Sequence, residues 1–382
     1  MKIAFLTPEF PHPKIGASGG IGTSIMNLSK GLIQLGHQVV ILVYGQNEDA
    51  NFQENGITFY KIKNVKFKGL SRFLTQKKIE KHINSLLIKK EIDLVEAPDW
   101  TGITSNIQPK CPVVIRLNGS DTYFCHLDNR PVKFLNKFHE KRALHKANAL
   151  LSVSQFTAES TQKIFSLKRD FEIIPNSIDV EKFNAEDGML KNSNNTILYF
   201  GTLIRKKGLL ELPLIFNEVF KSNNEAKLIL IGKDASDIIT GNSSTWQMMQ
   251  QLFTKESFQN VSYLGSVPYH EINRHINEAT VCVFPTFAEA LPVSWIEAMA
   301  MKKAIVASNI GWASEVIDND VNGFLVNPKD WVLYAQKIVE LLSSPILREN
   351  LGNEARKKVI EKFSIEVIAK KSLAFYKNVL KQ

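Results

Sequence analysis

The chain has 382 residues, of which 44% are hydrophobic and 22% charged, and its formal net charge is +9. At this length a single core stops growing, so we expect an ordinary globular protein of two domains with roughly 190 residues each. Cys111, Cys125 and Cys282 are odd in number and far apart, which argues against a disulfide framework or a zinc site. Few apolar residues precede Pro8 and no apolar run is long enough to span a bilayer, so we expect a cytoplasmic protein.

The first half alternates predicted strands and helices. Strands are predicted at residues 2–6, 38–43, 57–62, 94–96, 113–117 and 150–153, and helices at residues 23–35, 73–88, 133–146 and 156–165. This rhythm is typical of a parallel sheet with helices on both faces. The polar segment 184–195 lacks apolar periodicity, so we place a domain boundary there and assign residues 1–190 to the first domain.

A second strand–helix series is predicted over residues 191–364. Its strands are expected at residues 196–200, 227–231, 261–264, 281–284, 304–307 and 324–326, with helices at residues 209–221 and from Pro292 onward. A helix over residues 365–382 is expected to pack back toward the first domain. The predicted fold class is α/β, with two Rossmann-like parallel-sheet domains facing each other across a cleft lined by loops.

The positive charge is concentrated between Lys61 and Lys90, where ten basic residues accompany one acid, Glu80. Apolar residues such as Phe67 and Phe73 interleave with these charges, so part of the segment can form a basic amphipathic helix. Its apolar side faces either the protein's own core, which is the commoner meaning of a lysine run, or an anionic membrane or diphosphate-linked acceptor. Nucleic-acid binding is a weaker alternative, because no sequence motif of a nucleic-acid-binding domain accompanies the charge.

Two loops carry candidate phosphate ligands. Gly19 and Gly20 lie between the first strand and helix, where glycines let the backbone approach a phosphate; a structural turn is the alternative, and the dinucleotide motif fails because its third glycine is absent. Arg205, Lys206 and Lys207 precede the helix expected at residue 209. Cations at a helix N-terminus oppose the helix dipole, so we expect a bound anion there. The alternative is a solvated basic loop that binds no ligand.

Two carboxylates, Glu289 and Glu297, lie eight residues apart, the first in a strand-to-helix loop and the second inside the helix that enters at Pro292. Ligands of open α/β sheets bind beyond the carboxyl ends of the strands, and carboxylates are acceptors suited to sugar hydroxyl groups. A surface acid and an unrelated helix acid would give the same spacing. Asp318-Asn-Asp320 resembles a metal-binding motif, but it sits in a polar turn and we expect no metal there.

Several segments follow one another as they do in one enzyme family: GGIGTSIMNLSKGLIQLGHQV, IIPNSIDVEKF, YFGTLIRKKG, LILIGKD, Glu-x7-Glu and IGWASEVIDNDVNGFLV. The chain resembles the retaining nucleotide-sugar glycosyltransferases of family 4, which have the GT-B fold. The resemblance covers nearly the whole chain. The Glu-x7-Glu block and the lysine loop before it are its most specific parts.

The resemblance implies that Glu297 holds the donor ribose, that Glu289 holds the transferred sugar, and that Lys207 neutralises the diphosphate. The catalytic residues it implies are Glu289 and Lys207, and the donor-binding set is Gly19, Gly20, Arg205, Lys207, Val267, Glu289, Ala290, Leu291, Val293 and Glu297. It also implies catalysis without a metal or other cofactor, because cationic side chains and a helix end stabilise the departing diphosphate. Retention is attributed in the family to front-face attack, so no conventional general base is expected.

The chain departs from the family pattern at three points. Thr202 stands where an Arg commonly follows the glycine, and Arg205 is the candidate replacement. Asn118, with Asp121 nearby, stands where a sugar-binding His is common, so these two are candidates for acceptor or sugar binding. Pro292 removes one backbone N–H from the loop that binds the diphosphate.

We therefore expect a cytoplasmic glycosyltransferase that uses a UDP- or GDP-sugar and a glycan or lipid-linked acceptor in surface polysaccharide assembly. Peripheral binding to an anionic membrane through Lys61 to Lys90 is part of this expectation, and nucleic-acid binding is not. The alternatives are an epimerase or hydrolase of the same architecture, or a catalytically silent nucleotide-sugar-binding protein, which the missing Arg at Thr202 favours. The base, the sugar, the acceptor, the linkage and the oligomeric state are left open.

Overall fold

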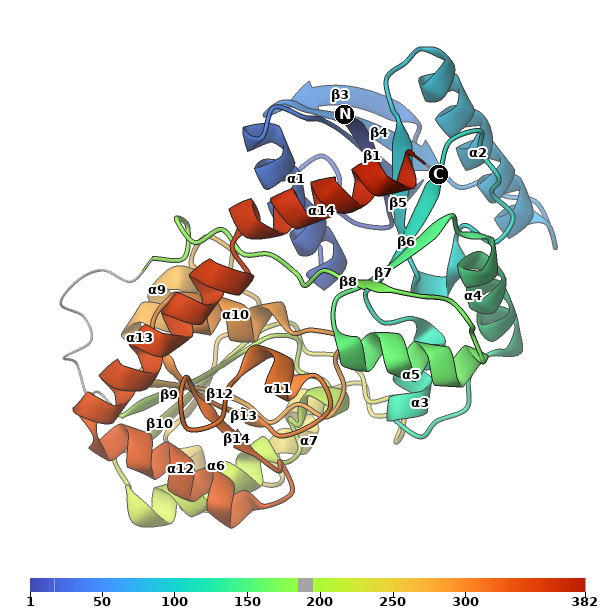
Figure 1. Ribbon diagram of the computed structural model, residues 1–382. Coiled ribbons are helices and arrows are strands. Elements are labelled where there is room, and N and C mark those ends of the chain that lie inside the picture. Colours follow the sequence, from blue (N-terminus) through green and yellow to red (C-terminus); the bar gives the residue numbers. More distant parts are fainter. Residues whose placement is uncertain (17, 185–194, 382) are drawn as a thin grey trace. The chain divides into compact units, whose positions relative to one another are not determined.

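The computed structural model describes residues 1–16, 18–184 and 195–381. The chain forms two compact units, one of Met1–Ser177 with Phe363–Gln382 and the other of Ile178–Lys362. Each unit contains one sheet with helices packed on its faces (Figure 1). This arrangement confirms the predicted α/β class with two parallel-sheet domains.

The compact units divide between residues 177 and 178, ahead of the boundary predicted between residues 190 and 191, which lies outside the described residues. Residues 178–184 pack with the second unit because Arg356 donates hydrogen bonds to the carbonyl oxygens of Val180 and Phe183. The chain returns to the first unit at Phe363, two residues before the predicted start of the C-terminal segment.

The first sheet has the strand order β3-β4-β2-β1-β5-β6-β7-β8 and is parallel except for β3, which pairs antiparallel with β4. Its strands are β1 (Lys2–Thr7), β2 (Gln38–Gln46), β3 (Ala50–Glu54), β4 (Ile57–Lys63), β5 (Leu94–Pro98), β6 (Val113–Leu117), β7 (Ala149–Ser152) and β8 (Glu172–Ile173). Its helices are α1 (Gly20–Gln34), α2 (Ser71–Ile88), α3 (Asp121–Leu127), α4 (Phe134–Lys146), α5 (Gln155–Phe165) and α14 (Ile365–Val379), with a 3-10 turn, η1 (Trp100–Gly102). The sequence did not predict β3, β8 or α3.

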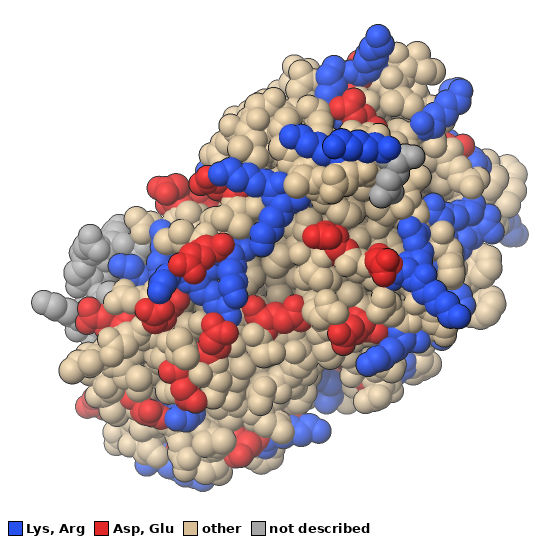
Figure 2. Space-filling model, viewed as in Figure 1, with Lys and Arg blue, Asp and Glu red and all other residues tan. Residues whose placement is uncertain are grey.

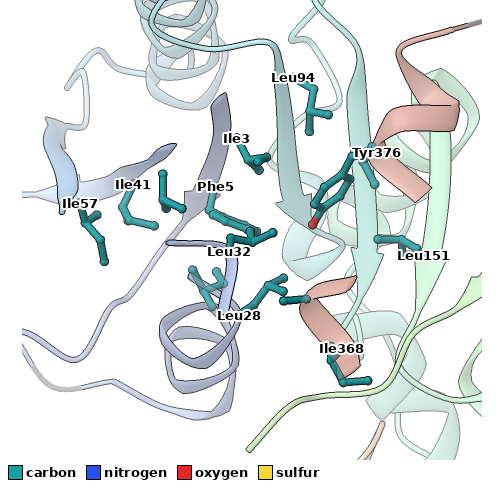
Figure 3. Close-up of a cluster of buried hydrophobic side chains, with 14 of the residues drawn as sticks. Ile3, Phe5, Leu28, Leu32, Ile41, Ile57, Leu94, Leu151, Ile368 and Tyr376 are labelled. Carbon is teal, nitrogen blue, oxygen red and sulfur yellow. The ribbon is translucent and has the colours of Figure 1, made fainter. Parts of the chain in front are cut away.

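The C-terminal helix α14 completes the core of the first unit. Figure 3 shows Ile368 and Tyr376 of α14 among buried side chains from β1, α1 and neighbouring strands. Helices α1 and α14 approach closely at Gly31, where an added Cβ would lie 2.8 Å from the Cβ of Ala369. The Tyr376 hydroxyl also donates to Oε2 of Glu96 at 2.5 Å, so α14 is held by a polar contact as well as by packing.

The second sheet is entirely parallel in its strand pairs and has the order β11-β10-β9-β12-β13-β14. Its strands are β9 (Thr196–Phe200), β10 (Lys227–Ile231), β11 (Val261–Tyr263), β12 (Val281–Phe284), β13 (Ala304–Ser308) and β14 (Phe324–Val326). Its helices are α6 (Leu212–Ser222), α7 (Thr245–Gln250), α8 (Lys255–Phe258), α9 (Ile272–Glu278), α10 (Val293–Ala300), α11 (Ala313–Val316), α12 (Trp331–Ser343) and α13 (Pro345–Lys362), with a 3-10 turn, η3 (Arg205–Lys207). These strands start where the sequence predicted them.

The helix predicted from residue 209 begins three residues later, and this corrects the argument built on it. Arg205, Lys206 and Lys207 form the separate turn η3, and Glu211 stands at the N-cap of α6. An acid at the N-cap complements the helix dipole. The three cations therefore do not lie at the N-terminus of α6, so the helix dipole gives no reason to expect an anion beside them. Any such reason must come from the residues that surround the cations in the structure.

Candidate functional site

Two loops of the second unit meet at the carboxyl ends of neighbouring strands, β9 and β12. The backbone N–H of Phe287 donates to the carbonyl oxygen of Lys206 at 2.8 Å, which joins the loop after β12 to η3. Gly208 lies against the same loop with φ of 71°, and an added Cβ would lie 1.8 Å from the carbonyl oxygen of Pro285. Only glycine fits there, so the two loops are fixed in register by backbone contacts.

This register places Lys207 against Glu289, the two residues predicted as catalytic. The Lys207 Nζ lies 2.8 Å from Oε1 of Glu289, and the side chains are only 20% and 16% exposed. Burial acts to raise the pKa of Glu289, but the charges of Lys207 and Lys206 and the hydrogen bond from Lys207 bring that pKa below its usual value. Glu289 is therefore ionised at neutral pH and can accept hydrogen bonds from hydroxyl groups.

Glu297 occupies a different environment, inside α10. Its carboxyl group is buried, and Oε1 accepts a hydrogen bond of 2.6 Å from the hydroxyl of Tyr269. Burial raises the pKa of Glu297 to about 7, although the hydrogen bond from Tyr269 and the charges of Lys182 and Lys207 act in the opposite direction. The two carboxyl groups thus differ in charge state near neutral pH.

The residues between the two carboxylates lead into α10. Ala290 and Leu291 are buried, and Pro292 is the N-cap of a helix whose first residue is Val293. The helix therefore starts one residue after the predicted entry at Pro292, because proline contributes no N–H and fits ahead of the first turn. The first N–H groups of a helix have no partner within it, so this end is suited to bind an anion.

Arg205 is held by an acid that the sequence did not single out. Its Nε and Nη2 donate to Oδ1 and Oδ2 of Asp237, both at 2.8 Å, and the Arg205 hydrogen bonds hold the pKa of Asp237 far below its usual value. Arg205 can therefore replace the Arg missing at Thr202 only if both of its hydrogen bonds to Asp237 break. Val267, predicted near the base, is half-buried in the loop between β11 and α9, two residues before Tyr269.

The glycine loop belongs to the first unit. Gly19 is the N-cap of α1 and Gly20 its first residue, while residue 17 lies outside the described part of the chain. An added Cβ on Gly20 would meet no atom within 4 Å, whereas one on Gly22 would lie 2.0 Å from Oγ of Ser18. Oε1 of Glu9 accepts from the N–H of Gly22 at 3.1 Å. A carboxylate that the sequence did not flag thus already contacts this helix start.

Asn118 and Asp121, the acceptor-side candidates, lie after β6 in the first unit. The Asn118 N–H donates to Oδ1 of Asp99 at 2.9 Å, and Oδ2 of Asp121 accepts from Asn136 at 2.9 Å. Asp99 is buried and its pKa is raised to about 7 by burial; among the described residues its Oδ2 has no hydrogen-bond partner. The position of Asp99 directly after β5 was the only signal in the sequence that could have identified it.

Two family models together match residues 18–358. Residues 18–182 match Glycosyltransferase Family 4, and residues 181–358 match Glycosyl transferases group 1. An uncharacterized glycosyltransferase of Methanocaldococcus jannaschii, MJ1607, is 27% identical, with 99% of this chain and 98% of that protein covered. The capsular polysaccharide biosynthesis glycosyltransferase CapM of Staphylococcus aureus is 28% identical over 54% of each chain.

A solved structure agrees with these matches at the level of the fold. The Anabaena protein HepE in complex with UDP-glucose has a TM-score of 0.75 and 18% identity, covering 99% of this chain and 100% of that one. The likeness identifies the fold as GT-B, as the sequence predicted. The chain belongs to the family 4 glycosyltransferases, the GT-B enzymes that use nucleotide-sugars and include proteins of polysaccharide and glycolipid biosynthesis.

Proposed function

We propose that the enzyme transfers a sugar from a UDP- or GDP-sugar to a glycan or lipid-linked acceptor, with retention at the anomeric carbon and without a metal ion or other cofactor. The observation that supports this most strongly is the buried pair of Lys207 and Glu289 at 2.8 Å. It lies just before α10, whose Glu297 is buried and accepts a hydrogen bond from Tyr269. The site thus combines two carboxyl groups that can accept hydrogen bonds from hydroxyls with a cation and a helix N-terminus that attract phosphate. This combination suits a sugar joined to a diphosphate.

Each group has a role in this proposal. Glu297 accepts hydrogen bonds from the ribose hydroxyls, and Glu289 accepts them from the transferred sugar. Lys207 turns from Glu289 toward the diphosphate, where the backbone N–H groups of Leu291 and Val293 join it. Because the leaving diphosphate gains negative charge as the glycosidic bond breaks, a cation fixed in a buried loop stabilises the transition state more than the ground state.

Metal independence is the part of the proposal that most needs a direct test. Cationic side chains and the start of α10 supply the positive charge that a divalent ion would otherwise supply. Asp318, in the sequence that resembles a metal-binding motif, pairs with Lys358 at 2.9 Å, and its pKa is lowered although burial acts to raise it. Transfer should therefore continue at full rate in excess EDTA, and loss of activity that Mg²⁺ restores would refute the proposal.

A donor panel tests the central claim. Thermal unfolding is measured with UDP- and GDP-sugars, and a donor at 100 times its Kd should stabilise the protein by roughly 2.7 kcal/mol. The product of the best donor is then analysed by NMR for the configuration of the new glycosidic bond. An inverted bond would exclude retention, and saturable binding with no transfer to any lipid or glycan extract would favour the silent binding protein instead.

Membrane association completes the proposed function, with the enzyme in the cytoplasm and peripheral to an anionic membrane through Lys61 to Lys90. No helix in the described parts of the chain has the length and apolar character to cross a bilayer. In the structure, Ile79, Ile83 and Leu86 of α2 are buried against their own unit, as the commoner interpretation of the lysine run predicts. Most of the exposed large apolar residues of this segment, Phe67 and Leu70 among them, lie at or near the start of α2, and Ile88 is exposed at its end.

A further inference from the structure

Helix α4 exposes a cluster of large apolar side chains at its N-terminal end. Phe134 is 79% exposed, Leu135 65% and Phe138 47%, and the rings of Phe134 and Phe138 stack with their centroids 6.5 Å apart. Residues one turn apart lie on one face of a helix. Three such residues together form an apolar surface, which is distinct from the single exposed apolar residues that soluble proteins tolerate.

The apolar cluster is surrounded by positive charge. Lys133, Lys137 and Lys141 are exposed on the same helix, and among the described residues none of them forms an ion pair. The only acid of α4 is Glu140, which is buried and accepts hydrogen bonds from the N–H groups at the start of α3. The outward face of α4 therefore combines aromatic rings with uncompensated cations.

A second exposed apolar group lies next to α4. Phe67, Leu70 and Phe73 are exposed around the start of α2, and the guanidinium of Arg72 donates to the carbonyl oxygens of the turn η1. The same turn packs against α4, because an added Cβ on Gly102 would lie 2.3 Å from the carbonyl carbon of His139. We call these six apolar residues and the lysines among them the α2–α4 patch.

The figures show the two helices on one side of the first unit. Figure 1 draws α2 and α4 along its right-hand edge, and Figure 2 shows Lys and Arg side chains gathered over that edge with few acids between them. Arg72 of α2 donates to η1, and Gly102 of η1 lies against His139 of α4, so the start of α2 and α4 contact the same turn. The residues next to Arg72 and those next to His139 are therefore close to each other in the first unit, and both apolar groups are exposed there.

We propose that the α2–α4 patch enters the interface of an anionic lipid bilayer, with Phe134, Leu135 and Phe138 inserted and the lysines beside them at the headgroups. A lysine can lay its methylene stem on apolar surface while its ammonium group stays in water, so the exposed lysines beside Phe134, Leu135 and Phe138 suit a position at the headgroups. A second copy is a poorer partner, since a two-fold axis brings the same patch face to face and would oppose lysine with lysine. The inference rests on the proposed membrane association and deepens it by assigning the main anchor to the exposed aromatic residues and lysines of α4, with the apolar residues at the start of α2 beside them.

Vesicle co-sedimentation of the full chain tests this inference. Wild type should bind phosphatidylcholine vesicles that contain phosphatidylglycerol and bind pure phosphatidylcholine weakly. The double variant Phe134→Ser/Phe138→Ser, and separately Lys133, Lys137 and Lys141 changed to Gln, should each lower partitioning about tenfold or more. Matched controls are Ile346→Ser, an exposed apolar residue of α13, and three exposed lysines of the second unit, Lys227, Lys255 and Lys357, changed to Gln. These controls should bind as wild type does.

The outcomes separate this inference from the broader proposal. If the α4 variants bind as wild type while changing Lys81, Lys89 and Lys90 to Gln abolishes binding, the anchor lies in the lysine run and the α4 inference is wrong. If wild type binds no anionic vesicle, membrane association fails as a whole, although donor binding and transfer in detergent remain testable. Dimer dissociation in the α4 variants, or binding to single-stranded DNA without binding to vesicles, would also overturn it. Unchanged circular dichroism shows that each variant folds.

Discussion

Donor affinity is expected to fall as the pH drops through about 7, because Glu297 changes charge there. Its pKa is raised to about 7 by burial, and the ionised carboxylate has acceptors for two ribose hydroxyls, whereas the protonated group carries a competing O–H donor. The sign follows from the raised pKa: the ionised form is present above pH 7 and is lost below it. Because the ionised fraction is about 90% near pH 8 and about 10% near pH 6, the Kd should rise about tenfold, or about 1.4 kcal/mol.

Isothermal titration calorimetry with the best nucleotide-sugar checks this expectation. Both phosphates of such a donor are esterified, so the donor itself keeps a constant charge over this range. Glu297→Gln is the matched control, because its amide has nearly the same shape and does not titrate. Wild type should release protons on binding near pH 7, which appears as a dependence of the measured heat on buffer ionisation, and the variant should not.

Two results would refute the reasoning. A wild-type Kd that stays flat between about pH 6 and about pH 8 would show that Glu297 does not hold the ribose in its ionised form. A pH dependence of equal size in Glu297→Gln would assign the titration to another group, and Asp99, whose pKa is also raised to about 7, would be the next candidate.

Three further predictions follow from contacts in the structure. Glu289→Gln should lower transfer about 100-fold while binding the free nucleoside diphosphate at least as tightly, since Lys207 loses its internal partner; weaker diphosphate binding in calorimetry would contradict this. Tyr269→Phe should raise the KM for the donor with little change in kcat and shift the titration of Glu297 upward, because the hydrogen bond that lowers its pKa is lost. An unchanged pH midpoint would contradict that role. Tyr376→Phe should destabilise the protein by about 1.5–3 kcal/mol in urea unfolding, since it removes a buried hydrogen bond to a charged group; a midpoint equal to wild type would show that α14 is held by packing alone.

The buried parallel strands could be predicted closely, whereas the exposed and short elements could not. Strands covered on both faces read as continuous apolar runs, and Val281–Phe284 was predicted with its observed bounds. β3 reads ANFQE and is exposed along most of its length, so neither alternation nor an apolar run marks it. α3 has seven residues and depends on the Ser120 side chain and on Glu140, which lies far along the chain.

The candidate site divides in the same way. The loops that carry Lys207 and Glu289 could be predicted, because each follows a recognisable strand and β9 and β12 are neighbours in the sheet. The partners of the predicted residues could not. Tyr269 reaches Glu297 across 28 residues and Asp237 reaches Arg205 across 32, and no local pattern distinguishes a tyrosine or aspartate that will make such a contact.

The place of α14 in the core of the first unit has a consequence for synthesis of the protein on the ribosome. The residues that begin this unit leave the ribosome first, yet Ile368 and Tyr376 belong to the same hydrophobic cluster. Roughly 190 residues must be translated between Ser177, where the first part of this unit ends, and Ile368, which takes about 10–40 s at cellular rates of about 5–20 residues per second. Until then the side of α1 that packs on α14 is uncovered. The nascent first unit is therefore a substrate for chaperones during translation, and its folding finishes only after the second unit has been synthesised.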